Sequence, residues 1–188
     1  MIHLEHERYS KIRLFEACVS SLALLVDRDK LLFSWRRPRI AICHRLAHYL
    51  EQTIFGQIHP SKPDEYVFDL SAPVGGPEFR TVNPDILLHN RDTDHPIRPM
   101  AIICRDDYLS EQELNLLHLL KTKAQCTLSL AIAFLPQKPY LLIYRADDEW
   151  IDYYHFEREN SHCHLLRRRD MGELIDDGNQ LKLGIKRR

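Results

Sequence analysis

Two histidines, His44 and His48, are spaced so that a helix would present both to one metal ion. Residues four apart lie one turn apart on the same side of a helix, and Glu51 adds a carboxylate near that side. Imidazole and carboxylate groups are zinc ligands. A zinc metalloprotease helix also needs a glutamate directly after its first histidine, and that residue here is Arg45. The pattern excludes that hydrolytic chemistry and leaves a plain zinc site as the alternative to half-exposed helix residues.

A second dense group is His162, Cys163 and His164. In an extended segment the two histidines share a face. Zinc needs about four ligands, and no second ligand pair stands nearby in the sequence, so we expect a surface turn. No Ser-His-Asp order, nucleophile elbow or glycine-rich phosphate loop is present in the sequence, so acyl transfer and nucleotide hydrolysis have no support.

Two basic clusters could bind phosphate. Arg36, Arg37 and Arg39 stand at the start of a predicted helix, and a second cluster lies between residues 167 and 188. Guanidinium forks match phosphate groups, so these side chains could line a groove for a nucleic-acid backbone. The alternative is that nearby acids, among them Asp170 and Glu173, neutralise a solvated tail.

A late segment is crowded with aromatic residues, namely Trp150, Tyr153, Tyr154 and Phe156. Protein interfaces favour Tyr and Trp, so this segment could contact a protein partner. The alternative is a strand with aromatic residues on both faces, one of them packed on the core.

The composition is that of one folded domain. The chain has 188 residues, of which 44% are hydrophobic and 28% charged, which excludes a disordered chain. Lys and Arg number 26 against 27 Asp and Glu, so the net charge is -1 and there is no global basic field.

The sequence predicts a cytoplasmic protein without membrane contact. Its first residues are charged and lack the apolar stretch of a signal peptide, and the apolar run at residues 22–26 is far shorter than the roughly 20 residues of a membrane span. The cysteines are five, scattered and without a CxxC pair, as in a reducing compartment.

The elements that position these residues follow from apolar spacing. Helices are predicted over residues 4–26, 40–55 and 110–123, the last because Ser110 and Glu113 form a capping box. Strands are predicted over residues 65–70, 82–89, 100–104, 127–135, 140–144 and 150–156. This order predicts an α/β fold in which helices flank a central mixed sheet. Residues 1–35 form an N-terminal helical extension, 36–157 the core and 158–188 a charged C-terminal tail of one globular unit.

Three segments follow one another in the sequence: the helical segment 45–51, Glu65-Tyr66, and the run Asn83-Pro84-Asp85 that opens an apolar strand ending at His89. In their order and spacing these segments resemble small bacterial proteins of the PD-(D/E)xK nuclease superfamily. The resemblance covers roughly residues 37–135 and implies a restriction-endonuclease-like core. In such relatives a buried strand then carries an acidic residue, a spacer and a lysine. They often occur beside other genes of bacterial defence or mobile-element systems.

The resemblance implies that Asp85 is the first acidic ligand of a Mg²⁺ ion. The ion in such relatives activates a water and neutralises charge on the phosphate. The second acid and the lysine would stand at Ile103 and Arg105. Isoleucine cannot bind a metal, and arginine holds a phosphate but does not exchange a proton near neutral pH. The leading hypothesis is therefore a nuclease-like protein with an incomplete metal site that binds nucleic acid or another protein subunit.

Two further hypotheses remain open. In an active, divergent nuclease, Asp85, Glu65 and Asp107 would be the carboxylates, with Asp85 and Glu65 holding Mg²⁺, and Lys121 would replace the missing lysine. In a pure protein-interaction subunit, the late aromatic segment would be the contact surface. In the leading hypothesis no cofactor is needed, and Arg105, Arg36, Arg37 and Arg39 bind phosphate.

Overall fold

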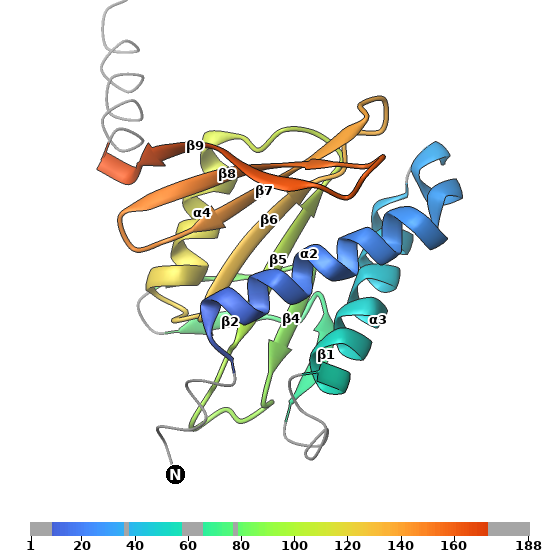
Figure 1. Cartoon of the computed structure of the whole chain (residues 1–188). Helices are drawn as coiled ribbons and strands as arrows, with labels where there is room; N and C mark the ends of the chain where they lie inside the picture. The colour runs from blue at the N-terminus through green and yellow to red at the C-terminus, as the bar shows by residue number, and fades with distance from the viewer. Residues whose placement is uncertain (1–8, 36–37, 58–65, 77–78, 173–188) are drawn as a thin grey trace, which may run out of the picture.

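The computed structural model describes residues 9–35, 38–57, 66–76 and 79–172. Helices α2 (Lys11–Arg28) and α3 (Arg39–Gln57) cover one face of a seven-stranded sheet, and α4 (Glu111–Thr122) covers the other (Figure 1). A short 3-10 helix, η1 (Lys30–Ser34), joins α2 to α3. The predicted α/β class with a mixed sheet flanked by helices is therefore confirmed.

The large sheet has the order β1-β4-β5-β6-β7-β8-β9. Its strands, in chain order, are β1 (Val67–Leu70), β4 (Ile86–His89), β5 (Met100–Arg105), β6 (Leu128–Ala133), β7 (Tyr140–Ala146), β8 (Trp150–Glu157) and β9 (Cys163–Asp170). Neighbouring strands are antiparallel except β5 and β6, which are parallel and joined through α4. The short strands β2 (Val74–Gly76) and β3 (Phe79–Val82) form a separate antiparallel pair.

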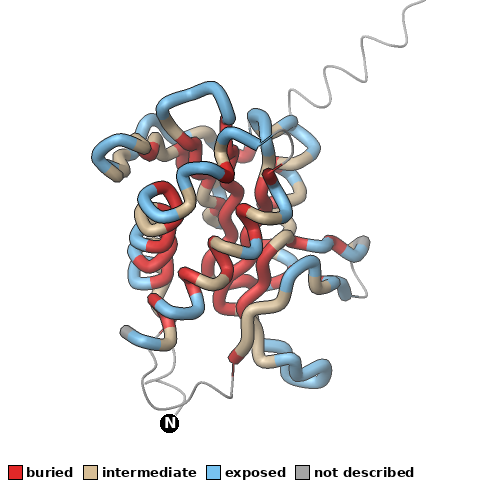
Figure 2. Tube along the Cα trace, turned by 90° about the vertical axis from the view of Figure 1, so that its right-hand side faces the viewer, coloured by how far each residue is buried: buried red, intermediate tan, exposed pale blue. Residues whose placement is uncertain are grey.

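Two hydrophobic cores lie on the two faces of the sheet. One lies beneath α2 and α3 and the other beneath α4, and the central strands are buried between them (Figure 2). All six residues of β6 and the first five of β5 are buried. This agrees with the unbroken apolar runs in their sequences, which are typical of strands covered on both faces.

Local signals determine the helix starts. The Ser110 hydroxyl accepts from the Glu113 amide while the Glu113 carboxylate accepts from the Ser110 amide, so the predicted capping box is confirmed. Ser10 likewise caps α2, with its hydroxyl accepting from the Arg13 amide. The predicted N-terminal extension is packed into the fold, because Leu14, Leu22 and Leu25 of α2 are fully buried.

Several predicted boundaries differ from the structure; the helix predicted over residues 4–26, for example, starts at Lys11 and ends at Arg28. The strand predicted over residues 82–89 is interrupted at residues 83–85, where Pro84 has no amide to donate to a sheet, and its two parts belong to different sheets. The predicted charged tail from residue 158 contains β9, which pairs along its length with β8. Its basic residues obscured the strand pattern. They are accommodated because β9 is an edge strand whose Arg168 and Arg169 pair with acids of other elements.

No helix in the described ranges is long and apolar enough to span a membrane. All five cysteines are free thiols.

Candidate functional site

Asp85 and Arg105 meet at the carboxyl end of β5. Asp85 directly precedes β4, and the antiparallel register pairs Ile86 with Ile102, which brings Asp85 beside the last residues of β5. Asp85 Oδ2 accepts a hydrogen bond of 2.7 Å from the Cys104 amide and one of 3.1 Å from Arg105 Nη1. These two charged side chains are thus in direct contact.

A third charged group, Glu113, completes the cluster from the first turn of α4. Arg105 Nε donates to Glu113 Oε1, while the Ser110 amide and hydroxyl donate to Oε2 at 2.9 and 2.8 Å. Burial raises the pKa of Glu113, but the Ser110 and Arg105 hydrogen bonds outweigh it, so the pKa is lowered overall. The sequence indicated Glu113 only as a capping residue. A carboxylate has two oxygens, so a glutamate that uses one of them for capping can still accept a hydrogen bond from a cation with the other.

The guanidinium therefore lies between two carboxylates. Arg105 Nη1 also donates to the Cys104 carbonyl oxygen at 2.7 Å, so one side chain joins α4 to the loop before β4 and to the backbone of its own strand. The side chains of Arg105, Asp85 and Glu113 are 28%, 18% and 25% exposed. Such a half-buried, charge-assisted network holds the guanidinium in place and engages both carboxylates.

A cavity of about 410 Å³ borders this network. Arg105 and Ile103 line it from β5, Leu116 and Leu119 from α4, and residues 81–83 from β3 and the turn after it. Ile103 stands at the position where the resemblance requires the second acid, and it is only 3% exposed. The wall beside Arg105 is thus largely apolar where a metal-binding carboxylate would be needed.

Of the other predicted catalytic residues, the two that the structure describes, Asp107 and Lys121, do not join Asp85. Asp107 is exposed in the turn after β5, and its carboxylate accepts from the Tyr108 amide. Lys121 lies 3.9 Å from an Asp148 carboxylate oxygen, and about 12 Å along α4 from Glu113, because eight residues at a rise of 1.5 Å separate them. Glu65 lies outside the described residues.

The two predicted phosphate-binding arginines that the structure describes, Arg39 and Arg105, lie apart. Arg39 is exposed at the start of α3, which packs on the sheet face opposite to α4. Arg36 and Arg37 lie outside the described residues. Of the arginines that the structure describes, Arg105 borders the cavity. Its guanidinium forms ion pairs with two carboxylates, those of Asp85 and Glu113.

Of the two interpretations of the late aromatic segment, the strand with aromatic residues on both faces is confirmed, because Tyr153 and Phe156 are buried in β8, while Trp150 and Tyr154 are half-buried. The side chain of Arg168 lies over the Trp150 ring and that of Arg145 over the Tyr154 ring. These aromatic side chains serve the two cores and pack against arginines.

In the part of the chain that the structure describes, neither His44 with His48 nor the run at residues 162–164 forms a zinc site by itself. His44 is exposed, and His48 makes a 3.0 Å hydrogen bond to Gln52. Cys163 and His164 belong to β9 instead of a turn. Within the described ranges, the group with metal-ligand geometry is His155, Glu157 and His164. The alternating pattern His155-Phe156-Glu157 in a strand was a signal for it that the sequence interpretation missed.

No family model, curated protein or solved structure matches this chain.

Proposed function

We propose that this chain is a non-cleaving relative of PD-(D/E)xK nucleases that acts as a protein-binding subunit of a larger assembly. The observation that carries this proposal is the Arg105 guanidinium held between Asp85 and Glu113. In a cutting relative, the corresponding place would hold Mg²⁺.

The order of the elements supports the kinship. Helix α3 is followed by three antiparallel neighbours, β1, β4 and β5, and then by α4 and the parallel strand β6. The resemblance implies this same sequence of a helix, a first strand, a Pro-Asp strand and a buried strand. Asp85 adjoins the end of the buried strand, where the acid and lysine of an active relative would stand.

The chemistry of the cluster argues against cleavage. Mg²⁺ prefers hard oxygen ligands and must keep water molecules that it can activate. Here a permanent positive charge already occupies the carboxylates, and a second cation would have to displace it. Ile103 adds no ligand. The cluster therefore stabilises the junction of β4, β5 and α4 instead of binding a catalytic ion.

The surface of β9 favours a protein partner over a nucleic acid. Arg168 pairs with Asp152 and Arg169 with Glu111, so much of the basic charge on β9 is balanced internally. Leu165 and Leu166 on the same strand are 50% and 56% exposed. A strand at the end of the sheet order that carries exposed leucines can pair with or pack against another chain.

A nuclease assay tests the first half of the proposal. Purified protein with Mg²⁺ or Mn²⁺ should leave plasmid DNA and RNA intact. Cleavage that disappears in Asp85→Ala would overturn the proposal.

Rebuilding the missing groups gives a complementary test. The double variant Ile103→Asp/Arg105→Lys restores the acid-spacer-lysine pattern, and we expect it to gain Mg²⁺ binding measurable by calorimetry. The matched control is Ile103→Asn/Arg105→Lys, which disturbs packing similarly but adds no carboxylate. If neither variant, although folded by circular dichroism, binds Mg²⁺ better than the wild type, Asp85 does not mark the ancestral metal position.

A binding comparison tests the choice of partner. The wild type should retain a protein from the source cells that Leu165→Glu/Leu166→Glu loses, since two charges are then placed on the exposed strand. Fluorescence anisotropy with duplex DNA should show no tight, salt-sensitive binding. DNA binding that weakens steeply with salt and with Arg167→Glu would instead identify a nucleic-acid partner.

A further inference from the structure

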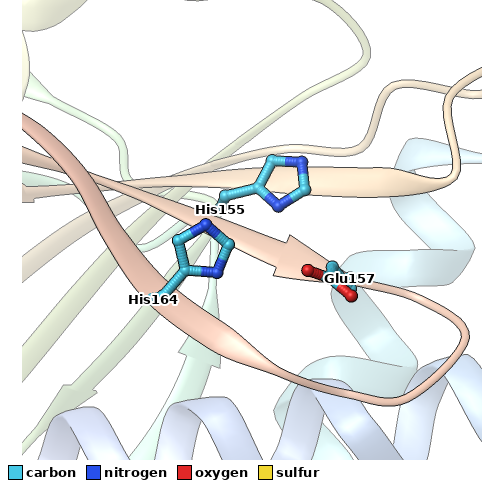
Figure 3. Close-up of side chains that lie close together, drawn as sticks. All are labelled: His155, Glu157 and His164. Carbon is cyan, nitrogen blue, oxygen red and sulfur yellow. The ribbon is translucent and has the colours of Figure 1, made fainter.

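The hairpin of β8 and β9 gathers three metal-ligand side chains on one face of the sheet. His155 and His164 are direct partners in the antiparallel register, and Glu157 follows His155 by two residues and so projects to the same side. One ligand atom from each residue lies within 4.8 Å of the other two. Figure 3 shows the two rings and the carboxylate close together over the hairpin.

Both imidazoles carry a buried nitrogen that the described residues leave unsatisfied. The Nδ1 atoms of His155 and His164 are shielded from solvent and have no hydrogen-bond partner in the described ranges. Leaving a buried polar atom without a partner is unfavourable, and a bound ion is a recognised explanation for such an atom. The rings are also held by packing, with centroids 5.2 Å apart and the Tyr140 ring 4.4 Å from that of His155.

Glu157 is oriented by its own contacts. Its Oε2 accepts a 2.7 Å hydrogen bond from the Asn160 side-chain amide, and its backbone amide donates to the His162 carbonyl oxygen at 2.9 Å. Outer contacts of this kind fix the direction of a ligating carboxylate. Among the described residues no hydrogen bond uses the other carboxylate oxygen, Oε1, which leaves it for an ion.

We propose that His155, Glu157 and His164 bind one divalent transition-metal ion, for which Zn²⁺ is the best fit. Two imidazole nitrogens and one carboxylate oxygen form a three-ligand zinc set that leaves a fourth position for water. Mg²⁺ and Ca²⁺ prefer ligand sets made of oxygen, so they should not compete. Cys163 is excluded as a ligand because it packs against the core under α2 and α3, on the other face.

The site is separate from the Arg105 network. The sheet register runs from Arg105 through Ala133, Leu142 and His155 to His164, and places Arg105 three strands away from His155. At about 4.8 Å per strand this separation is roughly 14 Å. A metal ion at the hairpin would therefore join β8 to the edge strand β9 without touching Arg105, and this inference does not depend on the proposed function.

Zinc titration of the untagged, chelator-treated protein tests the site. Calorimetry should show one Zn²⁺ per chain, and Zn²⁺ should raise the unfolding temperature whereas Mg²⁺ should not. His164→Gln and Glu157→Gln should each weaken binding by at least about 10-fold. Glu157→Gln is nearly isosteric, so it should fold even where a histidine replacement does not. The absorption spectrum of Co²⁺ bound to the wild type reports the ligand geometry without any substitution.

The matched control is His44→Gln/His48→Gln, which removes the other histidine pair of suitable spacing and should bind Zn²⁺ like the wild type. The proposal is overturned if the wild type binds no stoichiometric Zn²⁺. It is equally overturned if binding persists in folded His155→Gln/His164→Gln, or if it is lost with the control pair.

Discussion

Replacing Arg105 by methionine removes the cation that joins α4 to the end of β5. Methionine keeps an unbranched stem, so packing along the cavity wall changes little. The variant loses the hydrogen bonds to Asp85, to Glu113 and to the Cys104 carbonyl oxygen. The two carboxylates then have no cation between them.

The expected loss of unfolding free energy in Arg105→Met lies between the loss for a surface ion pair and that for a buried ion pair. The three side chains are half-buried, whereas breaking a fully buried pair costs about 3–5 kcal/mol and a surface pair about 0–1 kcal/mol. Each carboxylate also keeps a donor, namely the Cys104 amide for Asp85 and the Ser110 groups for Glu113. We expect the free energy of unfolding to fall by about 2–3 kcal/mol, and the unfolding temperature by about 4–12 °C.

Urea unfolding followed by circular dichroism at neutral pH measures this cost. The control is Arg13→Met, at an exposed position of α2, which should change stability by less than about 0.5 kcal/mol. Because the folded pKa of Glu113 is lowered, its pairing with Arg105 stabilises the protein fully above about pH 4.3 and less as the pH falls through the folded pKa. The difference between wild type and Arg105→Met should therefore shrink in acid. Equal stability of Arg105→Met and Arg13→Met, or a difference unchanged in acid, would refute the reasoning.

Other parts of the fold give three further expectations. The fully buried Asp152 carboxylate bonds two arginines, so Asp152→Ala should lower the unfolding free energy in urea by about 3–5 kcal/mol, and a loss below about 1 kcal/mol would contradict this. The hydrogen bond from Arg91 holds the pKa of Asp69 at about 2, so stability from this pair is present above about pH 3.9 and is lost as the pH falls towards 2. An NMR titration should follow that pKa and find it raised in Arg91→Ala; an unchanged pKa would show that Arg91 is not its cause. Burial raises the pKa of Cys18 and Cys126 to about 12, so a thiol reagent at mildly alkaline pH should label them only after unfolding, and rapid labelling of the folded protein would contradict their burial.

Elements with local signals could be predicted. The capping box of α4 depends on residues three apart, and the apolar stripe of α2 on steps of three and four residues. The buried runs of β5 and β6 likewise stand out in the sequence because both of their faces are covered. These signals sufficed to predict the α/β class and the order of most elements.

Elements that depend on distant partners could not be predicted. The strand β9 looks like a charged tail until Asp152 and Glu111 are known to receive its arginines. The hairpin cluster was missed for a related reason, because His164 was considered with its neighbours in the sequence and not with its cross-strand partner His155.

By itself, the amino-acid sequence determined the class of fold, the start of the capped helix α4 and the buried central strands, since each follows from a pattern within a few residues. Only the tertiary structure decided that Arg105 is held between Asp85 and Glu113, and that His155 and His164 face each other. Ion pairs and metal-ligand sets depend on distances in space. Strand register and the packing of α4 on the sheet set those distances, so they cannot be read from neighbouring residues in the sequence.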